Sequence, residues 1–294
     1  MHEAAEALIA VVIVALAWSY GVSAIASVAT STIAQRVEEE TWRGSLTLHT
    51  LLIYFADNSS KLAYLNPDKV ASLSEVYRDS GGPYEGNYTR LLNDKDKLGL
   101  SDVNFHLQMR PSLQVDAEET GEGIVVSVFK GNETKPVQAQ VKLYLVDEGG
   151  VSAYSGETGI EGKFIFNIQA SGKCALIFAK VGASVGYSTV GNVQVRTDRG
   201  YVQNGFLKGS SRPASFKTFS FEDYSDSSGQ VSVGGFSLPV LLVWEEEGSW
   251  NAIPYPHLPE GYGPTPSAQV FKLATSVFIG NGVFQVDLEV WRRE

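Results

Sequence analysis

An uncharged segment near the N-terminus limits what this chain can fold into more than any other feature. Residues 7–35 contain no Asp, Glu, Lys or Arg and consist mainly of Ala, Val, Ile, Leu, Ser and Thr. As an α-helix of about 1.5 Å per residue, this run would reach about 43 Å, more than the ~30 Å hydrocarbon core of a bilayer. Charge returns at Arg36 and at Glu38–Glu40. We therefore predict one long apolar helix within residues 1–43, whose surface lipid or protein must cover.

Three interpretations of this helix differ in what covers it. A cleaved secretory signal needs a positively charged start, whereas His2, Glu3 and Glu6 precede the apolar run, although Ala24-Ile25-Ala26 would suit cleavage. A membrane anchor usually has a Lys/Arg cluster on its cytoplasmic side, and here Arg36 stands alone, on the side joined to the rest of the chain. The third interpretation is a helix packed against copies of itself.

Small and polar side chains favour self-packing. Helix backbones approach closely where side chains are small, and a serine hydroxyl can donate to the carbonyl four residues earlier without water. The predicted assembly helix has Ser19, Ser23, Ser27 and Ser31 at four-residue spacing, with Trp18, Gly21 and Ala26 beside them. Compositional bias in a weakly hydrophobic membrane helix is the alternative explanation of this stripe.

The first 40 residues resemble the N-terminal region of the archaeal type IV pilin and archaellin superfamily, in which an uncharged helix with an acidic residue near its start precedes an outward-facing β-rich domain. The resemblance implies a subunit that is held in the cytoplasmic membrane, is taken up by filament assembly machinery, and polymerises with itself through the helix. In that family the acidic residue neutralises a neighbouring N-terminal amine during assembly. Glu3 and Glu6 flank the corresponding place, and position 5 is Ala5.

Residues 44–120 are predicted to be a mixed connecting segment. The dipeptide Asn66-Pro67 is typical of an N-cap followed by the first helical position, so we expect a helix from there to about Tyr77. A second short helix is possible at 88–94. Apolar and polar residues alternate over 105–109, which predicts a strand.

From Gly123 onward the sequence predicts an antiparallel β-sandwich, because short apolar or alternating runs are divided by Gly- and Ser-rich turns. Over 137–146, Val, Ala and Leu alternate mostly with Gln and Lys, so we expect a strand with one buried face. The predicted strands are 124–129, 137–146, 164–166, 176–181, 193–196, 231–233, 238–244, 270–278 and 283–291, with a Gly280-Asn281-Gly282 turn before the last.

The run 158–166, Thr-Gly-Ile-Glu-Gly-Lys-Phe-Ile-Phe, is similar to the T-G-x-x-G-x-F turn of prealbumin-like and carboxypeptidase-regulatory-like sandwich modules. This resemblance covers residues 121–197 and implies the sandwich class without an activity. The predicted fold class is α+β, with a hydrophobic helix at 1–43, a connecting segment at 44–120 and an Ig-like β-sandwich at 121–294.

A proline-rich segment interrupts the predicted strands near the C-terminus. Residues 250–268 contain five prolines with Tyr255, His257 and Tyr262, and prolines do not suit a central strand. The segment is either a contact surface for a neighbour or a well-packed long connection.

Charge and cysteine content exclude several classes of function. A net charge of −10 argues against nucleic acid as a partner, since such binders depend on clustered Lys and Arg. The single cysteine, Cys174, cannot form an intramolecular disulfide, and its apolar surroundings predict a small buried side chain. Asn58, Asn87 and Asn132 are possible glycosylation sites in N-x-S/T sequons.

We find no pattern that predicts catalysis, a metal site or a cofactor. His2, His49, His106 and His257 are scattered without metal-ligand spacing. A weak similarity to the start of a calcium loop is found at Asp223, Asp226, Ser228 and Gly229, but the glutamate that such a loop needs later is missing. The carboxylates of Asp94 and Asp96 are expected to be solvated.

The sequence therefore predicts a structural, non-enzymatic subunit of an extracellular filament, which polymerises through its N-terminal helix and displays a β-sandwich for adhesion. The alternative is a membrane-anchored cell-surface binding or stator protein with an Ig-like ectodomain.

Overall fold

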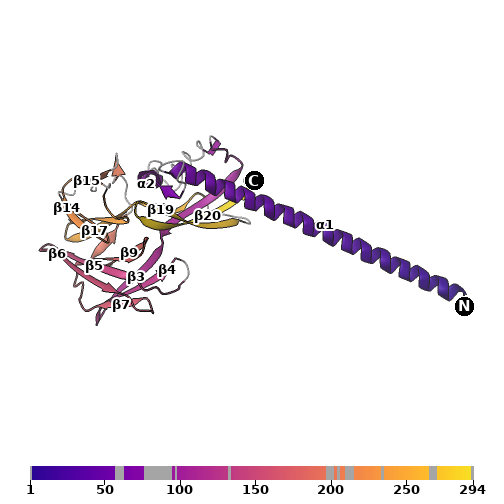
Figure 1. Cartoon of the computed structure of the whole chain (residues 1–294), viewed down its shortest axis with the longest axis horizontal. Coiled ribbons are helices and arrows are strands. Elements are labelled where there is room, and N and C mark those ends of the chain that lie inside the picture. The colour runs from indigo at the N-terminus through magenta and orange to yellow at the C-terminus, as the bar shows by residue number, and fades with distance from the viewer. Residues whose placement is uncertain are drawn as a thin grey trace. The chain divides into compact units, whose positions relative to one another are not determined.

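The computed structural model describes residues 2–56, 63–75, 95–96, 98–131, 134–196, 202–203, 206–208, 215–232, 235–264 and 270–292. The chain divides into two compact units, Met1–Leu46 and Thr47–Glu294. The first is helical, and the second consists mainly of β-strands (Figure 1).

Helix α1 spans His2–Phe55 and is longer than the predicted helix at 1–43. Its last turns, which fall in the predicted connecting segment, continue the helix because Leu48, Leu51, Leu52 and Phe55 fall at helical spacing and pack into a core of the second unit. Lys69 Nζ donates a hydrogen bond of 2.7 Å to the Ala56 carbonyl, which satisfies an acceptor at the end of α1.

Within the described part of the chain, no helix combines the length and the apolar character needed to cross a membrane.

Helix α2 (Pro67–Glu75) begins where the sequence predicted. The Asn66 side-chain oxygen accepts hydrogen bonds from the backbone amides of Asp68 (2.9 Å) and Lys69 (3.1 Å), which confirms the N-cap. The predicted end at Tyr77 and the predicted helix at 88–94 lie outside the described residues.

The described strands form four sheets. Seven strands of the nine-stranded sheet follow the order β1-β19-β20-β9-β8-β5-β6. Of the other two, β2 pairs with β20, and β18 pairs with β2. Its strands are β1 (Tyr64–Leu65), β2 (Val103–Pro111), β5 (Gln140–Asp147), β6 (Gly150–Glu157), β8 (Cys174–Val181), β9 (Ser184–Gly191), β18 (Glu260–Tyr262), β19 (Phe271–Ile279) and β20 (Gly282–Arg292). The predicted hairpin is confirmed, since β19 and β20 pair up to Ile279 opposite Gly282.

Three smaller sheets complete the second unit. The five-stranded sheet is β10-β17-β16-β13-β14, and two three-stranded sheets are β3-β4-β7 and β11-β12-β15. Their strands are β3 (Leu113–Thr120), β4 (Gly123–Lys130), β7 (Lys163–Phe166), β10 (Val193–Val195), β11 (Val202–Gln203), β12 (Phe206–Lys208), β13 (Phe216–Phe219), β14 (Tyr224–Ser227), β15 (Gln230–Ser232), β16 (Val240–Glu246) and β17 (Ser249–Tyr255).

Strands β5 and β8 are covered on both faces. Leu143 and Ile177 pack with β3 and β4 in one core, whereas Tyr144, Leu176 and Phe178 pack with β13, β16 and β17 in another. The expectation of one buried face over 137–146 is therefore wrong from Leu143 onward, because a second sheet covers the face expected to be solvated.

The turn at 158–162 holds three segments together. The Thr158 hydroxyl accepts from the Ala139 amide and donates to the Val137 carbonyl, both at 2.8 Å. Gly162 has φ +68°, and a Cβ there would lie 2.6 Å from the Val128 carbonyl oxygen, so only glycine fits.

The proline-rich segment is largely a packed connection. Tyr255, Leu258 and Tyr262 are buried, and Pro254 lies inside β17 opposite Leu241. Among the described residues, β10 pairs with β17 only up to Ala252, and this leaves a side of β17 at Pro254 where no strand needs a backbone N–H from it.

Candidate assembly surface

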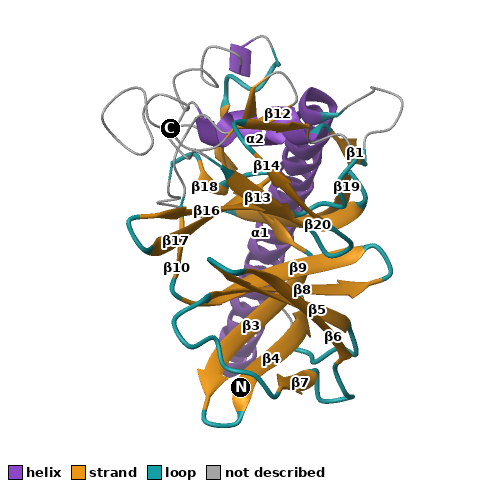
Figure 2. Cartoon of the chain, turned by 90° about the vertical axis from the view of Figure 1, so that its left-hand side faces the viewer, coloured by secondary structure: helices purple, strands orange, loops and turns teal. Residues whose placement is uncertain are grey.

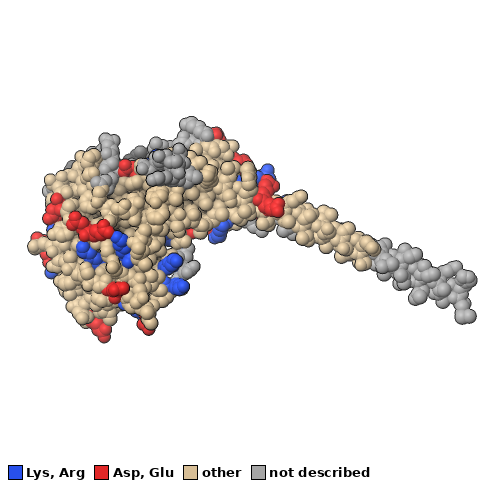
Figure 3. Space-filling view, in the orientation of Figure 1, with Lys and Arg blue, Asp and Glu red and all other residues tan. Residues whose placement is uncertain are grey.

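The described part of α1 in the first unit exposes large apolar side chains. Trp18 is 76% exposed, Tyr20 78% and Ile25 72%, and Val22 and Val28 are also exposed. Figure 3 shows the uncharged surface of this helix, which gives way to carboxylates where Glu38–Glu40 occur in the sequence. Side chains of this size in water favour association, at about 25 cal/mol per Å² of buried apolar area.

These side chains lie on more than one face of the helix. Trp18 and Tyr20 are two residues apart, so they project about 200° from each other around the axis. Ile25, seven residues after Trp18, lies about 20° from it on the same face, and Val28 lies about 80° from Trp18. A helix that is uncharged all round and has large apolar side chains on opposite faces is stabilised by partners on more than one side, so this surface suits a helical core better than a single groove.

The predicted stripe residues are on the same exposed helix, as Ser19, Gly21, Ser23, Ala26, Ser27 and Ser31 are all exposed. A Cβ added at Gly21 would meet no atom within 4 Å, so nothing within this chain requires glycine there. Since glycine in a helix costs about 1 kcal/mol relative to alanine, a close approach by another helix would account for it.

Hydroxyl back-bonding occurs, but largely at residues that the stripe did not include. Ser31 donates to the Val28 carbonyl (2.9 Å), three residues earlier instead of four. Thr30 and Thr32 donate to the carbonyls of Ala26 and Val28, both at 2.8 Å. These bonds satisfy hydroxyls that would otherwise need water in a dry interface. The threonines could have been found from the same four-residue rule.

Several predicted site residues fall outside the described part. The side chains of Glu3 and Glu6 are not described, and neither are the sequon residues Asn58, Asn87 and Asn132.

The three histidines whose side chains are described lie on separate elements. His49 is exposed on α1, and Nδ1 of His106 on β2 lies 3.4 Å from the Gly263 carbonyl oxygen. His257 lies in the packed segment after β17. Among the described residues, no three His, Cys, Asp or Glu side chains are arranged to hold a metal ion.

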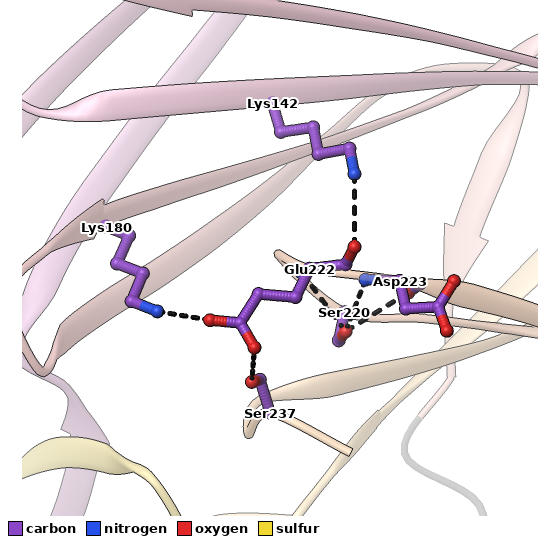
Figure 4. Close-up of polar contacts among 6 residues, drawn as sticks. All are labelled: Lys142, Lys180, Ser220, Glu222, Asp223 and Ser237. Carbon is purple, nitrogen blue, oxygen red and sulfur yellow. Dashed lines mark hydrogen bonds and ion pairs between the residues drawn. The ribbon is translucent and has the colours of Figure 1, made fainter.

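The weak calcium pattern instead borders a polar cluster around Glu222 (Figure 4). Lys180 of β8 forms an ion pair with the Glu222 carboxylate, and the Ser237 hydroxyl donates to the same group at 2.6 Å. Lys142 of β5 donates to the Glu222 carbonyl at 3.3 Å, and Ser220 accepts from the Asp223 amide at 3.1 Å. The cluster ties the loop between β13 and β14 to the central strands.

The Lys180 ammonium, followed by the Ser237 hydroxyl, holds the pKa of Glu222 below its ordinary value of 4.5. A lowered carboxyl pKa adds stability that is present above pH 4.5 and lost as the pH falls through the lowered value. Because the Glu222 side chain is 54% exposed, we expect Glu222→Gln to reduce stability at neutral pH by less than about 1 kcal/mol. Thermal unfolding at a series of pH values should show a weaker acid destabilisation in the variant, and an unchanged pH profile would contradict this.

Cys174 is fully buried in the core that contains Leu176 and Phe178, as its apolar surroundings predicted. Burial raises the pKa of its thiol to about 12, so almost no thiolate is present at neutral pH. We expect a disulfide reagent such as DTNB to leave Cys174 unmodified in the folded protein and to react with one thiol per chain in denaturant. Rapid labelling without denaturant would contradict the packing around β8.

Comparison of the chain with protein-family models, with curated proteins and with solved structures gave no match in any of the three.

Proposed function

We propose that this protein is a structural subunit of an extracellular filament similar to a pilus or an archaellum, assembled through α1. The observation that supports this most is the exposed, uncharged surface of the described helix between Trp18 and Val28, where the largest side chains are about three-quarters exposed. The resemblance of the first 40 residues to type IV pilins and archaellins agrees with it.

Such a helix gains most from neighbours on every side. In a filament, each α1 packs among the α1 helices of other copies, which removes Trp18, Tyr20 and Ile25 from water together. Ser31, Thr30 and Thr32 enter that core with their hydroxyls already bonded to the helix backbone. The contact is heterologous, since one patch meets a different patch on the next copy, and this arrangement continues indefinitely as an open helical polymer.

The β-rich unit then forms the outer surface of the filament and supplies any adhesive contact. Its three hydrophobic cores give it a folded interior that does not require residues before Leu48. We propose an Ig-like arrangement for the part built on β3–β9, on the basis of the Thr158 turn and of the two sheets that pack on its central strands.

Filament formation is tested by shearing cells that express the full chain and fractionating the supernatant. We expect the protein to sediment with cell-free filaments that electron microscopy resolves, with the α1 helices in the filament axis. Recovery of discrete particles that remain with the membrane fraction would overturn the proposal in favour of a membrane-anchored binding protein.

A further inference from the structure

Among the described strands, β6 is an open edge of the nine-stranded sheet. It pairs with β5 on one side, and it is the last strand on that end of the sheet, as Figure 2 shows. It runs for eight residues, Gly150–Glu157, and its central residues Ser152–Ser155 are all exposed. Glu157 is its one charged residue. An exposed edge of this kind is a template for another strand.

Among the described strands, the others that end a sheet are short or charged. β1 has two residues, β10 three, and β7 and β14 four each. The other eight-residue edge, β3, contains Asp116, Glu118 and Glu119. Short length and charge are the usual means by which proteins prevent strand pairing. β6 lacks both protections, and it also lacks proline and a bulge.

The register with β5 shows which backbone groups of β6 face outward. The two strands are joined by a two-residue turn that closes at Asp147 and Gly150. In an antiparallel pair, hydrogen-bonded and non-bonded positions alternate from that closing pair. Positions 150, 152, 154 and 156 are therefore bonded to β5, and Val151, Ala153 and Ser155 direct their N–H and C=O groups to the free side.

We propose that β6 pairs with β6 of a second copy of this chain, antiparallel about a two-fold axis at Ala153. The outward residues fall into register there, because Ala153 faces the partner's Ala153, and Val151 faces the partner's Ser155. The same register places Ser152 opposite Tyr154 and Glu157 opposite Gly149. It therefore brings no like charges together and places no two large side chains directly opposite each other.

This contact differs in kind from the helical one. A two-fold contact is isologous and closes after two copies, so it does not lengthen a filament. It joins two subunits through their outer units, and between filaments it produces lateral pairs. The inference goes beyond the proposed function and does not require it, because two free copies can pair in the same way.

Cysteine cross-linking tests the pairing. Residues opposite each other in a hydrogen-bonded antiparallel pair have Cα atoms about 5.5 Å apart, within the range that a disulfide bridges. We expect Ala153→Cys to form disulfide-linked dimers under mild oxidation about tenfold faster or more than Ile160→Cys, a control on the 81% exposed turn residue. The buried native thiol of Cys174 does not compete. Equal cross-linking of the two variants would overturn the proposal.

A charge variant separates this inference from filament formation. Ala153→Lys places two ammonium groups opposite each other across the axis, whereas Ile160→Lys adds the same charge away from it. We expect Ala153→Lys filaments to be single and of normal length, and Ile160→Lys filaments to remain paired. If wild-type filaments are unpaired, the β6 pairing is overturned and the proposed function stands. If Ala153→Cys cross-links rapidly in protein that forms no filaments, the β6 pairing is supported and the proposed function is contradicted.

Discussion

Replacing Ser23 or Ala26 by Leu is expected to abolish filament assembly while the β-rich unit stays folded. Each change adds a branched side chain where helix backbones would meet, and overpacking of a close contact costs about 1–3 kcal/mol. Every copy in a filament repeats that cost, so the polymer is affected much more than the monomer. The measurement is the fraction of protein that ultracentrifugation pellets as filaments, together with circular dichroism of the β-rich unit.

Size-matched variants provide the control. Ser23→Ala and Ala26→Ser keep small side chains, and we expect them to assemble as the wild type does. Gly21→Ala is the sharper comparison, because it meets no atom of its own chain and should favour the isolated helix by about 1 kcal/mol. If Gly21→Ala nevertheless weakens the filament, the lost stability must come from a contact between chains. Normal yields from both leucine variants would count against close helix packing.

Truncating Leu176 or Ile177 to alanine is expected to lower the free energy of unfolding of the β-rich unit by about 2–5 kcal/mol each. Both side chains are fully buried, but they belong to different cores on the two faces of β8. Each truncation leaves a cavity between sheets that cannot fully close. Urea unfolding followed by tryptophan fluorescence measures the effect, since Trp244 is itself buried.

An exposed strand position sets the baseline for these measurements. Ser276→Ala on β19 removes a hydroxyl from the surface, and we expect it to change stability by less than about 0.5 kcal/mol. If either Leu176→Ala or Ile177→Ala behaves like this control, the corresponding face of β8 is not packed as described.

Local signals in the sequence predicted the elements that local chemistry specifies. The Asn66 cap, the turn at Gly280–Gly282 and the apolar runs that became β4, β8 and β20 depend on residues close together in the chain. Other strands were missed for a physical reason. β6 and β9 are rich in Ser and Gly, and β3 is acidic, so neither hydropathy nor alternation distinguishes them from loops. Their strand conformation comes from pairing with neighbours.

The features of the candidate site also divide into those that the sequence predicted and those that needed the tertiary structure. The uncharged run, Gly21 and the serine spacing were visible as sequence, whereas the Thr30 and Thr32 back-bonds and the free edge of β6 became visible only in three dimensions. The edge could not be inferred beforehand, because whether a strand is an edge depends on where distant strands lie.

The sequence by itself determined that this chain has a long uncharged helix followed by a β-rich region, because charge distribution and short-range periodicity follow from the order of residues alone. Only the tertiary structure decided that α1 continues to Phe55, that β5 and β8 are buried on both faces, and that β6 is left open. Burial and strand pairing depend on residues far apart in the chain, so they are fixed by how sheets stack and not by any one segment.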